Sequence, residues 1–588
     1  MSTISSESYK NPILRIGEPY NFRWPLLNSA QIRKLEVTKS HERNVQNKKI
    51  TELTSSHTYK TKLKPTLMES AGLSLARLCL ALAPQAEQIW IACGPGNNGG
   101  DGIVAALELQ KLGKTAFVSV SGYIPEQSVN DSSNPTDSFM PISDHSSALQ
   151  AAKLMGIKLH TEAPNTWDFA IDAILGIGLD ENNPRPISGV MAMWLNLINT
   201  SSAPVLSVDT PSGLFVNTGH MSKFQAHGSK ELQTPQLNLN QKRYTLTFLG
   251  LKPGLFTGAG KDFAGEVWLD RLQENSLQEF SCEADLEYSA DIKSSIDGIH
   301  SHIHLNCSPT VKVRAQNTHK GTFSDVIILG GAKGMQGAAI LASTAALHMG
   351  AGRVYVCFLD DTAHNYRMNP ALMTRFSKDL DDFDLKSSTL VCGCGAGTSI
   401  TAYLQIVLSF AQNLVLDADA LNSIAADENL KLLLKKRSSS GKQTVLTPHP
   451  LEAARLLGIT TQEIQSNRVK FGHELARLFE CTVVLKGAGS VIAQTSLSKD
   501  RSTPVINSNE HESRIMINPT GCPLLATAGT GDVLAGMIGS LLAQNNDPWL
   551  STCEAVFIHG QTAQEWGPTD SFDAELLAQR VTYPRKFR

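Results

Sequence analysis

Residues 88–113 read QIWIACGPGNNGGDGIVAALELQKLG, and this stretch decides the fold of the N-terminal half. The apolar run from Ile89 to Cys93 predicts a buried strand, and the run after Gly102 has helical periodicity and stops at Gly113. A glycine-rich turn joins the two. This order of strand, turn and helix predicts a mostly parallel α/β sheet that is covered by helices on both faces.

The same alternation extends outward along the chain. Apolar strands follow at TAFVSVSG, DFAIDAIL, APVLSVD and RYTLTFLGL. The alternation of strands and helices resumes after residue 319, with strands at SDVIILGG, RVYVCFL, NLVLDADAL and CTVVLKGAGSVIA. Because a single core stops growing near ~250 to 300 residues, a chain of 588 residues is expected to form two α/β domains. We expect a polar extension with little chemistry over residues 1–64, a first domain over 65–275, a linker over 276–312 and a second domain over 313–588.

Composition excludes several classes of partner. A formal net charge of -3 and a pI near 6.6 give no electric field that would gather nucleic acid or an anionic membrane surface. The sequence has no uninterrupted apolar stretch of ~18 residues, and its first residues, MSTISSESYK, do not have the pattern that predicts a secretory signal. The 10 cysteines form no C-x-x-C pair, so we expect reduced thiols in a cytoplasmic protein that acts on small molecules.

Polar residues recur at strand ends in the N-terminal half. In GPGNNGGDG (residues 94–102), backbone N–H groups at a helix start can hold a phosphate or carboxylate. A tight strand-to-helix turn would also explain these glycines, and Asp172 or Asp209 alone would fit a helix cap or a turn. Their recurrence at successive strand ends favours one ligand pocket.

The strongest motif of the C-terminal half is NPTG (residues 518–521) followed by TAGTGDVLAG (527–536). Gly529 and Gly531 can open a helix whose N–H groups face a transferring phosphoryl group, while Asp532 in the first turn can accept a hydroxyl proton. A capped helix is the alternative, but the motif is longer than a cap needs.

Three further polar strand ends accompany this motif. KGAGS (486–490) can contact a nucleotide phosphate or adenosine, and LDADALN (416–422) and TPHP (447–450) supply other polar groups. His449 in the last of these fits a structural role and a pocket role equally well.

The N-terminal motifs GPGNNGGDG, DAILGIG, VDTPSGL and TLTFLGLKPGL with GEVWLD closely resemble the NAD(P)HX epimerase family over about residues 67–272. The resemblance implies a Rossmann-like three-layer α/β/α fold, a hydrated nicotinamide nucleotide as substrate, and Asp209 as a substrate-binding and catalytic carboxylate. It implies a potassium ion bound by Asn98, Asp172 and Ser212. The other substrate-binding residues that it implies are Asn97, Asn98, Gly99, Gly100, Asp101, Gly176, Ile177, Gly178, Leu179, Asp180, Glu181 and Asn182. The chain departs from the family at Asn217, where an acidic residue is usual.

The C-terminal motifs resemble the ribokinase-like superfamily and, within it, the ADP- or ATP-dependent NAD(P)HX dehydratases over about residues 319–579. The resemblance implies that Asp532 is the catalytic base and that magnesium bridges the nucleotide phosphates. The dinucleotide-binding residues that it implies are Ala338, Gly395, His449 and Asp532. The nucleotide-binding residues are Lys486, Gly487, Ala488, Gly489, Ser490 and Gly531. One departure is GCGAG at residues 393–397, where the family usually has G-P-G-L-G.

Together the resemblances predict a bifunctional enzyme that epimerises the R and S hydrates of NAD(P)H and dehydrates the S form at the expense of ADP or ATP. We expect ADP, which the fused enzymes usually take, and a homo-oligomer, which is common in both families. Two alternatives stay open. The C-terminal half fits a kinase that leaves the phosphate on its product, and the N-terminal half fits a nucleotide-sensing module without catalysis.

Overall fold

The computed structural model describes residues 13–17, 23–54, 63–124, 141–225, 232–272, 295–296, 299–362, 368–495, 513–545 and 547–587. The chain divides into two compact units, one containing residues 1–18, 25–284 and 293–300 and the other containing residues 19–24, 285–292 and 301–588. Much of the linker expected at 276–312 lies outside the described residues. Within the described residues, no helix is long and apolar enough to cross a membrane.

The first unit contains an eight-stranded sheet in which every strand is parallel to its neighbours except the edge strand β1. This confirms the parallel sheet that the strand–turn–helix order predicted. From edge to edge the sheet contains β1 (Leu14–Ile16), β10 (Glu266–Asp270), β9 (Arg243–Phe248), β6 (Val205–Val208), β5 (Phe169–Ala173), β2 (Ile89–Cys93), β3 (Ala116–Val120) and β4 (Leu159–His160).

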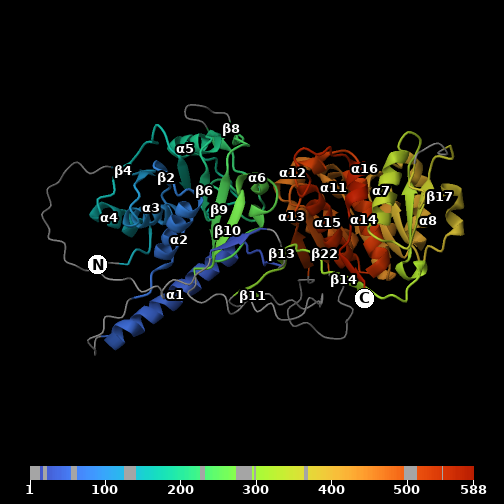
Figure 1. Ribbon diagram of the computed structural model, residues 1–588, viewed down its shortest axis with the longest axis horizontal. Helices are drawn as coiled ribbons and strands as arrows, with labels where there is room; N and C mark the ends of the chain where they lie inside the picture. Colours follow the sequence, from blue (N-terminus) through green and yellow to red (C-terminus); the bar gives the residue numbers. More distant parts are fainter. Residues whose placement is uncertain are drawn as a thin grey trace. The chain divides into compact units, whose positions relative to one another are not determined.

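Helices cover both faces of this sheet (Figure 1). Alternate residues of a strand point to opposite faces, so Ile89 and Ile91 of β2 join the core under α2 and α3, whereas Trp90 joins the core under α5. The three-layer α/β/α arrangement follows from this alternation. The helices of the unit are α1 (Ser29–Thr54), α2 (Leu67–Leu82), α3 (Asn97–Lys111), α4 (His145–Leu154), α5 (Gly189–Thr200) and α6 (Gly260–Phe263).

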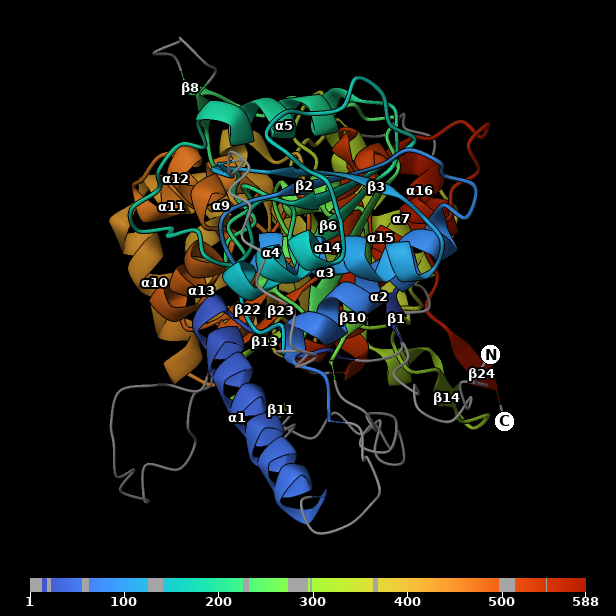
Figure 2. The same ribbon diagram turned by 90° about the vertical axis from the view of Figure 1, so that its left-hand side faces the viewer.

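Described parts of the N-terminal extension form a strand and a helix. β1 pairs with β10 at the sheet edge, and α1 runs for 26 residues. Figure 2 shows α1 as one long helix whose last turns extend away from the sheet of its unit. Among the described side chains of α1, the buried apolar ones are Ile32 and Leu35 near its start, so the packed face of the helix is confined to its first turns.

The second unit contains a ten-stranded sheet that is parallel except for β22, which is antiparallel to both neighbours. Its order is β13 (Ile303–Leu305), β23 (Ser513–Ile517), β22 (Val491–Thr495), β21 (Thr482–Leu485), β20 (Gln443–Leu446), β19 (Asn413–Leu416), β18 (Thr389–Cys392), β15 (Asp325–Gly330), β16 (Arg353–Phe358) and β17 (Met373–Phe376). The second unit also contains the two-stranded pair of β14 (Lys312–Arg314) with β24 (Arg585–Phe587). Two such pairs belong to the first unit, namely β7 (Phe224–Gln225) with β8 (Leu232–Gln233) and β11 (Ser295–Ile296) with β12 (Ile299–His300).

This sheet is also sandwiched between helices. Val484 and Ile492 face the core shared with α14, whereas Gly472 of α13 lies against Val491 and Leu485, which point to the other face. On the first face lie α7 (Gln336–His348), α14 (Thr530–Asn545), α15 (Pro548–Gln564) and α16 (Ala574–Arg580). The remaining helices are α8 (Thr401–Phe410), α9 (Ala418–Ala426), α10 (Glu428–Ser439), α11 (Pro450–Leu457), α12 (Thr461–Ser466) and α13 (Arg468–Phe479).

The packing of α14 against α7 predicts a sharp difference between two glycine substitutions. A Cβ at Gly536 of α14 would lie 1.9 Å from the Ala342 carbonyl oxygen, so Gly536→Ala must push the helices apart. We expect the free energy of unfolding to fall by about 1–3 kcal/mol, measured by denaturant titration. Gly337→Ala in α7 is the matched control, since a Cβ there meets nothing within 4 Å and should stabilise the helix slightly. Equal effects of the two substitutions would contradict this packing.

Candidate active sites

The carboxyl ends of β2, β5, β6 and β9 meet at one edge of the first sheet. Asp172 in β5 pairs in register with Ser207 of β6, and Asp209 follows β6 with its N–H donating to the Leu246 carbonyl at 2.8 Å. The strand ends therefore bring Asp172 and Asp209 to the edge where α3 begins, which is where ligands bind in open α/β sheets.

Residues 97–101 form the first turns of α3 rather than an open loop. A Cβ at Gly94 would lie 1.8 Å from the Ile174 oxygen, and one at Gly99 would lie 2.0 Å from the Gly94 oxygen, so this approach of strand and helix requires glycine. The N-cap residue Gly96 has no side chain to cap the helix. The first N–H groups of α3 are thus left for an anionic ligand.

Asp172 and Ser212 form a buried pair beside this helix start. The Ser212 hydroxyl donates to Asp172 at 2.6 Å, its backbone N–H donates at 2.9 Å, and burial raises the pKa of the carboxyl. Asn98 lies against Gly176, and its buried Nδ2 has no partner among the described residues. An exchange of amide oxygen and nitrogen would present an oxygen there instead, giving a set of oxygen ligands of the kind that hard cations prefer.

Asp209 forms an ion pair that sequence reasoning missed. Lys252 is fully buried and its Nζ lies 2.5 Å from Asp209 Oδ1, while the Phe248 N–H donates to the same oxygen at 2.9 Å. Asp209 has the left-handed backbone conformation (φ 63°), which a non-glycine residue adopts only when its surroundings hold it there. The sequence feature that could have indicated this ion pair is Lys252 itself, the single charged residue in the apolar stretch TLTFLGLKPGL.

The predicted second substrate loop, residues 176–182, is contacted by Asn98 at its beginning and by Asn217 near its end. Asn98 contacts the loop at Gly176, and Glu181 accepts a hydrogen bond of 3.1 Å from the Asn217 N–H. Asp180 accepts from the Asn182 N–H at 2.9 Å and so closes a turn within the loop. Asn217, the departure from the family pattern, therefore supports the loop through its backbone.

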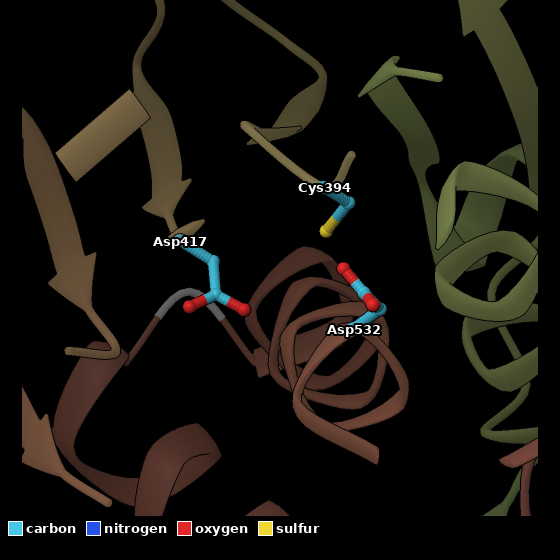
Figure 3. Close-up of side chains that lie close together, drawn as sticks. All are labelled: Cys394, Asp417 and Asp532. Atoms are coloured by element: carbon cyan, nitrogen blue, oxygen red, sulfur yellow. The ribbon is translucent and has the colours of Figure 1, made fainter. Parts of the chain in front are cut away.

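In the second unit, three side chains from distant parts of the sequence meet at the start of α14. Figure 3 shows the Cys394 sulfur and the Asp532 carboxylate facing each other, with Asp417 beside them at the end of β19. One ligand atom from each of these residues lies within 4.8 Å of the others. Gly529 enters the helix at φ 91°, a conformation that favours glycine.

The surroundings of Asp532 suit a proton acceptor near neutral pH. Burial, reinforced by the negative charge of Asp417, raises its pKa to about 6, whereas a hydrogen bond from the Cys394 thiol opposes the shift. Burial raises the pKa of Cys394 well above its ordinary value, so the thiol keeps its proton and acts as a donor. Cys394 stands in the GCGAG departure from the family motif, and its role was not predicted.

Lys486 compensates the buried charge of Asp417. Its Nζ lies 2.6 Å from Asp417 Oδ1, and although burial lowers the pKa of Lys486, the nearby carboxylates Asp417 and Glu452 raise it overall. A Cβ at Gly531 would lie 3.2 Å from the same Nζ. The lysine therefore places a positive charge directly against the N-terminal turn of α14, where both would attract a phosphate.

The loop after Lys486 is held by Arg468, which sequence reasoning also missed. This buried guanidinium donates to the carbonyls of Leu485 and Lys486 at 3.0 and 3.1 Å. Gly487 (φ 142°) passes over it, and a Cβ there would lie 2.8 Å from the guanidinium. The Gly487 N–H donates to the Ser490 hydroxyl at 3.3 Å, which closes the loop.

The predicted dinucleotide-binding residues other than Asp532 are Ala338, Gly395 and His449. Gly395 and Ala338 are adjacent, since a Cβ at Gly395 would lie 2.8 Å from the Ala338 Cβ. His449 is the N-cap of α11, where its Nδ1 accepts from the N–H groups of Leu451 and Glu452 at 3.1 and 3.3 Å. Nδ1 thus caps the helix, the side chain is 46% exposed, and the contact of this ring with the dinucleotide stays a prediction.

The NPTG segment is hydrogen-bonded to α15, and α15 in turn contacts the start of α14. Asn518 is buried and its amide donates to the Thr520 hydroxyl at 2.9 Å, and this hydroxyl donates to the Phe557 carbonyl at 2.9 Å. His559 of α15 lies 3.0 Å from the Thr530 carbonyl, and burial lowers its pKa to about 4, so the ring is neutral. The His559 contact holds the first residue of α14, two residues before Asp532.

The raised pKa of Asp532 predicts a cost in stability. Because the folded chain holds this proton up to about pH 6 rather than 3.8, stability falls as the pH rises between these values. We expect Asp532→Asn to raise the free energy of unfolding at pH 8 by about 1–3 kcal/mol and to have little effect at pH 3.5. Denaturant titrations at both pH values measure this, with the exposed Asp361→Asn as control. A lower stability of Asp532→Asn at pH 8 would contradict it.

Known families match both units. Residues 64–254 match the family described as YjeF-related protein N-terminus, and residues 326–582 match the NAD(P)H-hydrate dehydratase family. A bifunctional NAD(P)H-hydrate repair enzyme of Escherichia coli is 31% identical over 546 residues, which are 88% of this chain and 89% of that protein.

Shorter relatives match the second unit alone. An ADP-dependent (S)-NAD(P)H-hydrate dehydratase of Neisseria meningitidis is 34% identical over 280 residues, which are 46% of this chain and 86% of that protein. A crystal structure of an ADP/ATP-dependent NAD(P)H-hydrate dehydratase from Bacillus subtilis, co-crystallized with ATP/Mg2+, is 28% identical, covers 46% of this chain and 91% of its own, and has a TM-score of 0.36. Because two family models and a full-length relative agree, the chain belongs to the family of bifunctional NAD(P)H-hydrate repair enzymes.

Proposed function

We propose that each unit of this bifunctional enzyme works at the carboxyl edge of its own sheet. The first unit interconverts the R and S hydrates of NADH and NADPH, and the second dehydrates the S hydrate with ADP as the phosphoryl donor. The observation that carries the proposal is the Asp532 carboxylate at the start of α14, next to Gly531 and the Lys486 ammonium. The ADP-dependent relative from Neisseria meningitidis supports ADP over ATP.

Asp532 is the general base of the dehydration in this proposal. With a pKa of about 6 it is ionised at neutral pH and still basic enough to take a hydroxyl proton. The deprotonated ring hydroxyl attacks the terminal phosphoryl group of ADP, the bond to the leaving AMP breaks, and a phosphate ester forms. The ester then leaves as inorganic phosphate, driven by the ring nitrogen lone pair, and loss of a proton from the adjacent carbon restores the dihydropyridine.

The nucleotide and the dinucleotide approach Asp532 from different elements. Lys486, the N–H of Gly531 and the loop closed by Ser490 surround the place for the phosphates. Ala338 and Gly395 form a surface without bulky side chains beside Cys394, which suits a flat nicotinamide ring. The full proposed set comprises Lys486, Gly487, Ala488, Gly489, Ser490 and Gly531 for the nucleotide, and Ala338, Gly395, His449 and Asp532 for the dinucleotide.

Magnesium belongs to the nucleotide rather than to a cage of protein ligands. The acidic cluster at α14 contains a protonated thiol, Cys394, and a carboxylate, Asp417, that already binds Lys486, so it does not form the oxygen shell that Mg²⁺ requires. When bound to the phosphates, the ion neutralises charge that develops during transfer.

In the first unit, Asp209 is the carboxylate next to the reacting carbon of the hydrate. Its ion pair with Lys252 fixes the orientation of the carboxylate, and the start of α3 and the loop 176–182 surround the same edge. The potassium ion is assigned to Asn98, Asp172 and Ser212, which would hold it and orient the anionic substrate. The buried carboxyl of Asp172 accepts hydrogen bonds from Ser212 and interacts with the charge of Arg243, and a cation bound beside it would further stabilise its ionised form.

The proposed dehydration can be tested directly with purified protein, the S hydrate of NADH, magnesium and either ADP or ATP. We expect the NADH absorbance to return together with inorganic phosphate, and we expect Asp532→Asn to slow the reaction by about 10²–10⁴-fold because the base is lost. Asp361→Asn serves as the control. Phosphorylation without the return of absorbance would instead indicate a kinase that leaves the phosphate on its product.

The Cys394 hydrogen bond predicts a shift in the pH profile of this reaction. Activity should fall as the pH drops through the pKa of Asp532, which is about 6. Cys394→Ala removes the donor that stabilises the ionised carboxylate, so the acidic limb should move to higher pH by a few tenths of a unit to about one unit. Cys394→Ser should restore the limb, because the hydroxyl donates in the same way. A profile of Cys394→Ala that superposes on the wild type would contradict this role.

The potassium assignment predicts that only one activity depends on this ion. Replacing potassium by lithium should slow the conversion of the R hydrate several-fold and leave the dehydration of the S hydrate unchanged. Ser212→Ala should weaken the dependence on potassium concentration, because it removes one oxygen ligand. Equal effects of lithium on both reactions would contradict this assignment.

A further inference from the structure

The start of α1 is hydrogen-bonded to Asn217, in the segment that follows Ser212. Asn28 and Gln31 bond reciprocally, since the Asn28 Oδ1 accepts from the Gln31 N–H at 2.9 Å and the Gln31 Oε1 accepts from the Asn28 N–H at 2.8 Å. This capping box satisfies one of the early N–H groups of the helix. The N–H of Ser29, the first residue of α1, donates instead to the side-chain Oδ1 of Asn217 at 2.9 Å.

Asn217 also contacts the end of the loop 176–182. Its backbone N–H donates to the Glu181 Oε1 at 3.1 Å, and its side-chain Nδ2 donates to the Ser29 hydroxyl at 3.4 Å. Glu181 is half-buried; burial raises the pKa of its carboxyl, and hydrogen bonds from Asn217 oppose that rise. Asn217 therefore joins the first turn of α1 to the carboxylate near the end of the loop.

The beginning of this loop lies at the proposed potassium site. Leu175, just before the loop, donates its N–H to the Ser212 hydroxyl at 2.8 Å. Between the two ends, the guanidinium of Arg33 in α1 donates to the Ile177 carbonyl at 3.4 Å. The loop thus runs from the proposed ion site to Glu181, with a further contact from α1 on the way.

Packing holds the start of α1 in place independently of the loop. The Leu27 N–H donates to the Leu251 carbonyl at 2.7 Å, and the side chain of Ile32 is buried. A Cβ at Gly250 would lie 2.8 Å from the Leu27 side chain and 3.3 Å from that of Ile32, so this glycine permits the close contact. The first turn of α1 is therefore a fixed support for the loop.

Resting on the proposed epimerase function, we propose that Asn217 is a positioning residue that holds the loop 176–182 against the hydrated dinucleotide by attaching it to the start of α1. Substrate affinity then depends on an N–H group of the N-terminal extension, whereas Asp209 keeps its own ion pair with Lys252. A loop that is no longer attached must be ordered when the substrate binds, which weakens binding. Loss of the attachment should raise KM for the R hydrate and leave kcat unchanged.

A double-mutant cycle on the conversion of the R to the S hydrate of NADH tests this inference. The full-length protein is assayed with potassium and without ADP or ATP, so that dehydration does not consume the product. Ser29→Pro removes the N–H that reaches Asn217, and proline is favoured at the first position of a helix, so α1 should stay folded. Asn217→Ala removes the acceptor. Each should raise KM about three- to ten-fold, as expected for one hydrogen bond, and the double variant should raise it no further.

Two further variants serve as controls. Ser29→Ala keeps the backbone N–H and loses only the hydroxyl contact of 3.4 Å, so its KM should rise less than about two-fold. Val37→Ala, at an exposed position further along α1, should leave KM and kcat unchanged. Dehydration of the S hydrate with ADP by the same proteins reports folding and should be unchanged in every variant.

The role of Asn217 would be overturned if the effects of Ser29→Pro and Asn217→Ala on KM multiply in the double variant, because the two residues would then not act through one contact. A fall in kcat without a rise in KM, or unchanged KM values in proteins that convert the R hydrate, would overturn it as well. A wild-type protein that converts no R hydrate would overturn the proposed epimerase function itself, so the two failures are distinguishable.

Discussion

Both sites depend on carboxylates that are held, partly or wholly out of water, at the carboxyl edge of a parallel sheet. Removing a carboxylate from water costs several kcal/mol unless a cation or hydrogen bonds compensate it. Each unit uses a lysine for this purpose, Lys252 beside Asp209 and Lys486 beside Asp417. The consequences differ, because in the first unit the lysine binds the proposed catalytic carboxylate itself, whereas in the second it binds a neighbour.

That difference explains the chemistry assigned to each site. With Lys486 committed to Asp417, Asp532 experiences burial and a negative neighbour, and its pKa rises to about 6. A base of this strength suits the removal of a hydroxyl proton at neutral pH. In the first unit the compensated Asp209 lies among other carboxyls, and one of them, Asp101, is pushed towards its protonated form.

The sequence predicted the parts of the structure that are set by local pattern. Two parallel α/β units follow from alternating strands and helices. Glycine at the starts of α3 and α14 is required by a backbone contact at Gly94 and by the positive φ of Gly529. It did not predict partners that meet only in the folded chain. Lys252 and Cys394 come from segments that read as buried strand ends or loops, and nothing in their spacing pointed to Asp209 or Asp532.

The packing of the N-terminal helix α1 could not be predicted from the sequence either. Most of α1 is polar and exposed, and few apolar residues near its start pack against the unit. Its sequence pattern is therefore typical of a solvated segment rather than of a helix that packs against a sheet. His449 of the TPHP motif is the N-cap of α11, a contact that the strand-end pattern alone did not predict. Whether a polar residue supports the fold or faces a ligand depends on packing over long sequence distances.

The central claim is that one chain carries two independent active sites, one that depends on Asp209 and one that depends on Asp532. The most direct test starts from the pure R hydrate of NADH with ADP, magnesium and potassium, and follows the return of the NADH absorbance with Asp209→Asn, with Asp532→Asn and with an equimolar mixture. The account predicts that neither variant restores NADH alone at the wild-type rate and that the mixture does so at a substantial fraction of it. A mixture no faster than the better single variant, or an Asp209→Asn protein as fast as the wild type, would contradict it.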